Sequence, residues 1–192
     1  MGQRLVINII KDNKRIANIY YHWSAYSISA LEEARRLIDS GVFDESYSVK
    51  ELQLKLVRLI ESFGGCIDGG KDSEEYQKIC DMFPNKTFKE TGDRNEGLIA
   101  LSDDGMDKIE GWAEGIIDIN LDEGMIYNSV FCCETLDEFN KWREEDNKLE
   151  DFNEVDIEIS EIKFENIEET IRQIEILPYT FRQGDMIYEL IG

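Results

Sequence analysis

Proline, histidine and long apolar runs are scarce in this chain of 192 residues. The two prolines, Pro84 and Pro178, are too few for a proline-rich linker. No run approaches the roughly 18 consecutive apolar residues of a membrane-spanning helix. Because His22 is the only histidine and the four cysteines form no CxxC pair, the sequence predicts no structural zinc site. We therefore expect neither a metal ion nor another cofactor.

The cysteines Cys66, Cys80, Cys132 and Cys133 are too few for a disulfide scaffold. We expect them to be reduced and to serve as small apolar core residues. The first residues read as a strand and contain no apolar run ending in small residues, so no secretory signal is expected. Position 6 is Val where a myristoylation signal requires Ser or Thr. These features predict a cytoplasmic protein.

Positive charge is the next scarce property. The 42 Asp and Glu outnumber the 21 Lys and Arg, which gives a net charge of −21. Residues 1–60 hold nine bases and seven acids, so the acidic excess belongs to the rest of the chain. Such a field repels nucleic acids and membrane surfaces and attracts basic proteins. Apolar residues make up 42% of the chain, which is enough to bury a core.

Alternation of apolar and polar residues predicts most strands, and helical spacing with capping residues predicts most helices. The aromatic stretch NIYYHWSAY stands between a strand-like alternation of residues and a helix-like spacing. The expected strands are residues 4–10, 15–23, 97–101, 112–120, 125–132, 157–162 and 186–191. The expected helices are one from a Ser29–Glu32 capping box to Gly41, then 49–63, 72–82, one from Thr135, and 168–176. Residues 102–105 read as a turn, and GGCIDGG as a break between helices.

The fold class that follows is α+β, with antiparallel β-hairpins packed against four or five helices. We place a boundary near residue 90. Residues 1–90 would form an N-terminal lobe of a β-hairpin and helices, and residues 91–192 an acidic α+β lobe. The alternative is a single compact domain.

Two loops resemble ligand-binding motifs without fulfilling them. The sequence GCIDGGK at residues 65–71 matches GxxxxGK, but Asp72 stands where Ser or Thr should bind magnesium, and a helix rather than a strand precedes it. Residues 118–124 resemble a calcium loop whose glycine comes one position late, and Ser129 replaces the terminal Glu. We interpret the first as a helix connection and the second as a hairpin tip.

Two catalytic arrangements are also weighed. Glu161 and Lys163, with Asp151 or Asp156 upstream, resemble the carboxylates and lysine of metal-dependent nucleases. In a chain that is one-third charged such a triplet arises by chance, and a negative field opposes a polyanionic substrate. His22 beside Ser24 lacks the strand-turn-helix signature of a nucleophile, so we expect a histidine packed among aromatic rings. We name no catalytic residue.

The acidic run from Glu134 to Glu175 carries the functional hypothesis, because it holds sixteen acids and five bases. The simplest interpretation of this run is a solvated surface that maintains solubility and has no partner. The alternative is that carboxylates on a folded scaffold imitate phosphates and occupy the Lys and Arg of a nucleic-acid-binding protein. The predicted partner-binding residues are Glu144, Glu145, Asp146, Glu150, Asp151, Glu154, Asp156 and Glu158.

The opening GQRLVINI and the following YYHWSAYSISALE resemble small proteins carried by phages and mobile elements of low-GC Gram-positive bacteria. The resemblance covers about the first forty residues and brings no functional residue with it. Proteins of that kind include acidic anti-CRISPR inhibitors, some of which imitate nucleic acid. The resemblance therefore implies a non-enzymatic inhibitor in the host cytoplasm whose partner is a basic defence protein such as a Cas nuclease. Two alternatives stay open: a metal-dependent hydrolase or nuclease, and a sponge for a small signalling nucleotide.

Overall fold

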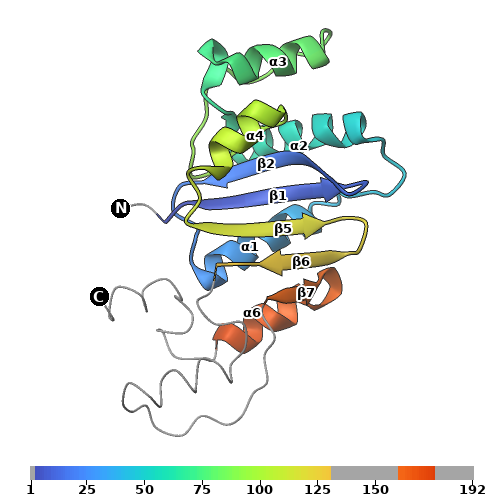
Figure 1. The fold of residues 1–192 in the computed structure, drawn as a ribbon, viewed down its shortest axis with the longest axis vertical. Helices are drawn as coiled ribbons and strands as arrows, with labels where there is room; N and C mark the ends of the chain where they lie inside the picture. Colours follow the sequence, from blue (N-terminus) through green and yellow to red (C-terminus); the bar gives the residue numbers. More distant parts are fainter. Residues whose placement is uncertain (1–2, 131–159, 176–192) are drawn as a thin grey trace, which may run out of the picture.

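The computed structural model describes residues 3–130 and 160–175 of the chain. Within these ranges seven strands form one sheet, in the order β3-β4-β2-β1-β5-β6-β7 (Figure 1). The strands are β1 (Leu5–Lys11), β2 (Lys14–Tyr21), β3 (Cys66–Ile67), β4 (Leu98–Ala100), β5 (Gly115–Asn120), β6 (Met125–Asn128) and β7 (Glu161–Lys163).

Five α-helices accompany this sheet in the described residues, which confirms the predicted α+β class. Figure 1 shows α1 behind the sheet and α4 in front of it. The helices are α1 (Ser27–Asp39), α2 (Val49–Phe63), α3 (Glu74–Met82), α4 (Asp103–Glu110) and α6 (Ile167–Glu175). Short 3-10 turns precede α3 and α6, at η1 (Gly70–Asp72) and η2 (Phe164–Asn166).

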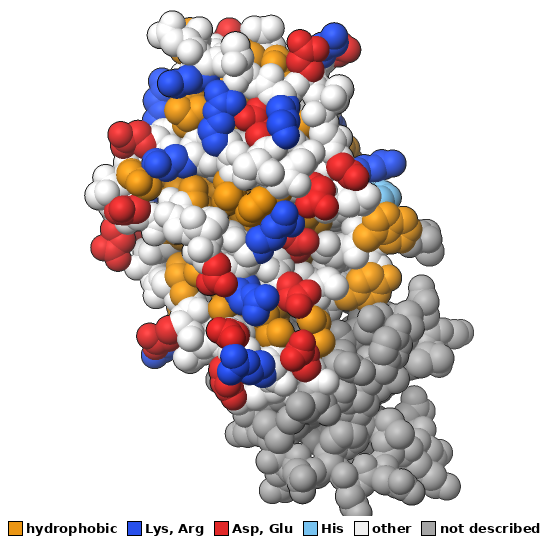
Figure 2. All heavy atoms as spheres, turned by 180° about the vertical axis from the view of Figure 1, so that it is seen from behind, with side chains coloured by type: hydrophobic (Ala, Val, Ile, Leu, Met, Phe, Trp, Pro, Cys, Tyr) orange, Lys and Arg blue, Asp and Glu red, His pale blue; other side chains and the backbone are white. Residues whose placement is uncertain are grey.

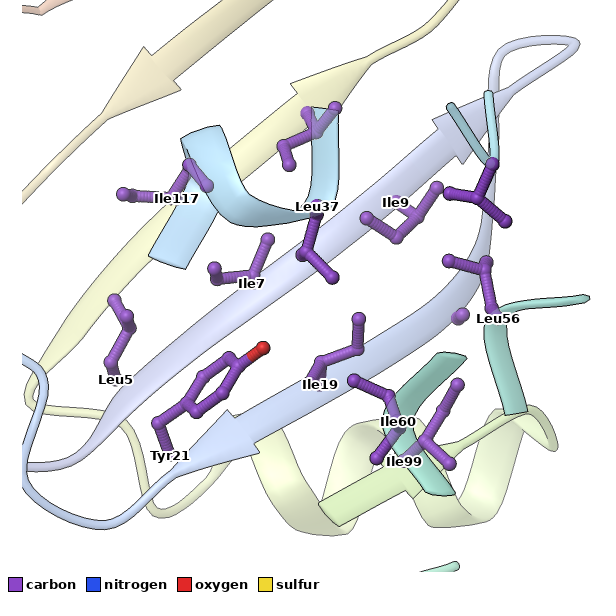
Figure 3. Close-up of a cluster of buried hydrophobic side chains, with 14 of the residues drawn as sticks. Leu5, Ile7, Ile9, Ile19, Tyr21, Leu37, Leu56, Ile60, Ile99 and Ile117 are labelled. Carbon is purple, nitrogen blue, oxygen red and sulfur yellow. The ribbon is translucent and has the colours of Figure 1, made fainter. Parts of the chain in front are cut away.

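The main core lies between the sheet and the helices α1, α2 and α6. Alternate residues of β1, including Ile7 and Ile9, point to this side because side chains alternate between the two faces of a strand. Figure 3 shows them gathered with Leu37 of α1 and with Leu56 and Ile60 of α2. All five of these side chains are fully buried.

A smaller apolar cluster occupies the opposite face of the sheet. There Val6 and Tyr20 pack against Met106 and Ile109 of α4. The edge of the Trp112 ring meets the Tyr20 ring with 5.8 Å between centroids. One helix therefore covers the β1–β2–β4 part of this face.

Helix α2 forms as its sequence predicts. The Ser48 hydroxyl accepts a hydrogen bond from the Glu51 N–H, and the Glu51 carboxylate accepts the Ser48 N–H, so a capping box is present. The helix ends at Gly64, whose φ of 111° is easily adopted only by glycine. The chain then turns directly into β3.

Two local predictions are wrong. Helix α1 begins at Ser27, with Tyr26 as its N-cap and no side-chain cap, so Ser29 does not cap it. The buried positions Ser27 and Ala30 extend the helix N-terminally, because tertiary packing overrides the capping pattern. Residues 102–105 are also not a turn: Ser102 caps α4, and its hydroxyl accepts the Gly105 N–H at 3.1 Å.

The strand pairings go beyond the hairpins that the sequence predicts. The β1–β2 and β5–β6 hairpins are present, but β1 also pairs in parallel with β5, and β3 in parallel with β4. Leu5 lies opposite Gly115 in the first of these pairs. Strands from both sides of residue 90 thus join the same sheet.

Candidate functional site

The predicted partner-binding residues Glu144, Glu145, Asp146, Glu150, Asp151, Glu154, Asp156 and Glu158 lie outside the described residues. The structure does describe the two points between which their segment runs. The chain leaves the sheet after β6, at Val130, and returns at Ser160 before β7. These strands are antiparallel neighbours, with Tyr127 opposite Glu161, and the Asn128 N–H donates to the Ser160 carbonyl at 2.8 Å. The 29 residues between them therefore start and finish at one edge of the sheet.

About half of the basic side chains in the described residues form ion pairs with carboxylates. These ranges hold 17 Lys and Arg against 29 Asp and Glu. Nine of the bases form ion pairs: Arg4, Arg15, Arg35, Arg36, Arg58, Lys71, Lys78, Lys108 and Arg172. Residues 131–159, by contrast, contain eleven acids and only three bases. The described scaffold is thus closer to internal charge balance than the segment it holds.

The described part of the acidic run lies on β7 and α6. Ile171 and Ile174 bury one side of α6, so its acids lie on the outer side. Glu165, Glu169 and Glu175 are exposed. Figure 2 shows acidic and basic side chains interspersed on the face of the molecule that it presents. The described acids alone therefore do not form a continuous negative surface on that face.

A buried polar cluster lies where the parallel strands β3 and β4 end. The Asp68 carboxylate, 4% exposed, accepts a hydrogen bond from the Lys108 ammonium at 2.9 Å. The Glu75 carboxylate accepts the Leu101 N–H at 2.7 Å, the Ser102 N–H at 3.0 Å and the Ser102 hydroxyl. The carboxyl ends of parallel strands commonly form ligand sites. Here each carboxylate already has protein donors, and the cluster joins α3 and α4 to the sheet.

The glycine-rich stretch at residues 65–71 directly follows helix α2, as the sequence predicts, and the two-residue strand β3 lies within it. Its Lys71 ammonium pairs with the Glu90 carboxylate at 3.2 Å. A hollow of about 670 Å³ adjoins the loop, and its charged lining residues are Lys71, Asp72, Glu90, Asp93 and Arg94. Because the three acids outnumber the two bases, the lining of this hollow does not favour the binding of a phosphate group. The charge pattern therefore gives no support to nucleotide binding at this loop, which the sequence does not predict either.

The loop that resembles a calcium site uses its oxygens within the protein. Asp122 accepts the N–H groups of Asp12 and Asn13, at 3.0 and 2.8 Å. Both donors have a φ of 55°, the left-handed conformation expected for that turn. The backbone donors, first Asn13 and then Asp12, hold the pKa of the Asp122 carboxyl below its usual value. Asp118 accepts a hydrogen bond from the Asn8 amide at 2.7 Å. Each of these carboxylates thus accepts hydrogen bonds from the first hairpin, which agrees with the interpretation of this loop as a hairpin tip.

The proposed nuclease residues occupy an open position. Glu161 and Lys163 are exposed on β7, while Asp151 and Asp156 lie outside the described residues. Over residues 3–130 and 160–175, no group of three or more His, Cys, Asp or Glu residues is placed to hold a metal ion.

His22 lies among aromatic side chains, as predicted. Its Nδ1 lies 2.7 Å from the Tyr20 hydroxyl, and its ring centroid lies 4.9 Å from that of Trp23. Trp23 is 51% exposed. Cys66 is buried, and its burial, with the Asp68 and Glu61 carboxylates, raises the pKa of the thiol. A raised pKa disfavours the nucleophilic thiolate. Cys132 and Cys133 lie outside the described residues.

Sequence reasoning missed the roles of Asp68, Glu75 and Ser102. The sequence pattern assigns no role to Asp68 or Glu75, and it predicts Ser102 only as part of a turn. The available signal was Ser102, which stands three residues before Gly105 at the start of an apolar helical pattern.

Comparison with protein-family models, with curated proteins and with solved structures finds no match to this chain. None of the helices that the structure describes is both long and apolar enough to cross a membrane. Functional inference therefore depends on the charges and contacts given above.

Proposed function

We propose that this protein is a non-enzymatic inhibitor that binds a basic, nucleic-acid-handling protein, and that the carboxylates of residues 144–158 take the place of phosphates. One observation supports the proposal above the others. The segment with eleven acids and three bases is an insertion between the paired strands β6 and β7.

Such an attachment favours binding. Because the segment is attached to neighbouring strands at both ends, the separation of its ends is already fixed before a partner binds. Loop-closure entropy grows only slowly with length, so an insertion of this size is tolerated by the sheet. The scaffold that carries it has a continuous buried core. A stable body that displays one strongly charged segment suits an interaction protein.

The charge pattern indicates the class of partner. Proteins that bind nucleic acid present Lys and Arg at phosphate spacing, and carboxylates can occupy these same groups. Opposite charges also speed the encounter at low salt. The resemblance of the first forty residues to phage-carried proteins suggests a defence protein, with a Cas nuclease as one candidate.

The test is charge reversal. The variant Glu144→Lys, Glu145→Lys, Asp151→Lys and Glu154→Lys should lose capture of basic host proteins from a Gram-positive lysate, and added DNA should displace those that the wild-type protein captures. A matched control makes the same charge change on exposed acids of the scaffold without ion pairs: Glu32, Glu45, Asp81 and Glu165. The control should retain capture.

Capture should weaken steeply as salt rises from about 0.05 to 0.5 M, because the Debye length falls well below the separation of exposed charges. Equal capture by the reversal variant and the wild type, with both folded by circular dichroism, would reject residues 144–158 as the contact. If DNA did not displace the captured proteins, the hypothesis that the carboxylates imitate nucleic acid would be rejected.

A further inference from the structure

Cations without a carboxylate partner gather on one surface of this acidic protein. Eight of the 17 described bases form no ion pair, and four of these eight surround α2: Lys50, Lys55, Lys86 and Lys89. Arg58 lies among them on the outer side of α2 and pairs only with Glu61. Figure 2, which presents the side of the molecule behind the sheet, shows blue side chains gathered over its upper part, where α2 lies. We call Lys50, Lys55, Arg58, Lys86 and Lys89 the basic surface.

Aromatic rings lie close to three of these cations, and the Lys50 ammonium lies 5.6 Å from the centroid of the Phe83 ring. The Lys55 ammonium lies 4.3 Å from the centroid of the Tyr47 ring. The Arg58 guanidinium carbon lies 4.8 Å from that of Phe88. A ring face attracts a cation and limits its movement, so less freedom is lost when a ligand binds.

A groove of about 630 Å³ crosses the basic surface between the end of α1 and the outer side of α2. Apolar and cationic side chains share its lining: Val42, Leu54, Leu59, Lys55, Arg58 and Lys86. Leu54 and Leu59 are partly exposed. The groove thus offers both a strip of apolar surface and positive charge.

The two carboxylates that interact electrostatically with Lys55, those of Glu51 and Asp44, accept hydrogen bonds from neighbouring serines. Glu51, which also lines the groove, accepts the Ser48 N–H at 2.9 Å and the Ser48 hydroxyl at 2.6 Å. Asp44 accepts the Ser46 N–H at 2.9 Å and the Ser46 hydroxyl at 2.7 Å. Neither carboxylate forms an ion pair with Lys55, so the Lys55 ammonium can still donate hydrogen bonds to an added anion.

We propose that this groove is a second docking site, which binds an acidic amphipathic peptide segment of a partner protein. Carboxylates of the peptide would meet Lys55, Arg58 and Lys86, and its apolar side chains would cover Leu54 and Leu59. Charge complementarity and the apolar strip favour a peptide over a nucleic acid. The Tyr47 ring already faces the Lys55 ammonium, and the Phe88 ring is buried beneath the Arg58 guanidinium, so neither ring offers an open platform for base stacking.

The experiment uses the full chain and fluorescence anisotropy. The probe is a labelled synthetic helical peptide that carries Leu at i, i+4 and Glu elsewhere. A second peptide replaces each Leu by Ser, and a single-stranded oligonucleotide represents nucleic acid. We expect the Leu peptide to bind most tightly and its affinity to fall with salt.

The variants Lys55→Glu and Lys86→Glu should each lower the affinity for the Leu peptide by about tenfold, because an attraction becomes a repulsion. Lys163→Glu makes the same charge change on β7, at the far edge of the sheet, and should bind as the wild type does. Lys55→Gln removes the charge without adding an acid and should have a smaller effect than Lys55→Glu. Thermal melts verify that each variant is folded.

Several results would overturn the proposal. One is the absence of binding by the wild type, and another is an equal loss in Lys55→Glu and Lys163→Glu. Equal affinity for the Leu and Ser peptides would remove the role of the apolar strip. Tighter binding of the oligonucleotide, lost in the same variants, would replace the peptide with a nucleic acid.

Discussion

Gly105 in α4 provides a sharp test of the buried polar cluster. Replacing glycine by alanine within a helix usually increases stability by about 1 kcal/mol. At Gly105 the added Cβ would lie well inside van der Waals contact of the Glu75 carboxylate, and 3.1 Å from the Ser102 hydroxyl. We therefore expect Gly105→Ala to be destabilising, and expect the sign of its effect to depend on Glu75.

The magnitudes follow from the contacts of Glu75. Its carboxylate accepts three hydrogen bonds, and each bond to a charged group contributes about 1.5–3 kcal/mol. These contributions are not additive, so Glu75→Ala should lower the free energy of unfolding by about 3–5 kcal/mol. Gly105→Ala should lower it by about 1–3 kcal/mol, the usual result of overpacking. In the Glu75→Ala background, Gly105→Ala should instead raise it by about 1 kcal/mol.

Urea denaturation followed by circular dichroism measures all four proteins of this double-mutant cycle. For a chain of this size, 1 kcal/mol corresponds to a change in Tm of about 2–4 °C. Glu75→Gln is the control, because its amide oxygen can still accept the Leu101 and Ser102 N–H groups, and it should be less destabilising than Glu75→Ala. If Gly105→Ala had the same effect with and without Glu75, the contact between them would be refuted.

Two further predictions concern single groups. Ser48→Ala removes the cap of α2 and should lower stability by about 1 kcal/mol, whereas Ser62→Ala, on the exposed side of the same helix, should not; urea denaturation compares the two. Burial raises the pKa of the Glu33 carboxyl above its ordinary value of 4.5, so its ionisation opposes folding. Because the folded pKa is raised, the wild type loses stability relative to Glu33→Gln as the pH rises through and above 4.5, and thermal melts should show the variant equal near pH 4 and more stable at pH 7. A variant that is less stable at pH 7 would show that the ionised carboxylate is needed.

Local signals predicted the helices that their own residues specify. Helix α2 has a capping box, an apolar stripe and a terminal glycine, and each of these is present in the structure. Helix α1 has a similar pattern at Ser29, but the buried side chain of Ser27 lies two residues before it and is part of the helix. A capping pattern contributes about 1 kcal/mol, which the burial of a further turn can outweigh.

The parallel pairings could not be predicted in this way. Strands β1 and β5 are separated by about a hundred residues, and β3 is only two residues long. A parallel pair has no turn sequence of its own, because its connection passes through other elements. The same limit applies to the candidate site. Composition indicated which segment is acidic, but only the pairing of β6 with β7 shows that both ends of this segment meet at one edge.

The groove and the attachment points of the acidic segment lie at different parts of the sheet, and this separation suggests a test. Helix α2 packs on β2, β3 and β4, whereas the acidic segment runs from β6 to β7. From β4 to β6 there are four strand spacings of about 4.8 Å, or about 19 Å. That exceeds twice the Debye length of about 8 Å at physiological salt, so charges separated by at least this distance should act independently. Combining Lys55→Glu with the fourfold reversal of residues 144–154 should therefore change peptide binding as Lys55→Glu alone does, within about 0.5 kcal/mol. A larger coupling, measured by anisotropy at physiological salt, would mean that the acidic segment and the groove meet, and the two surfaces would have to be treated as one.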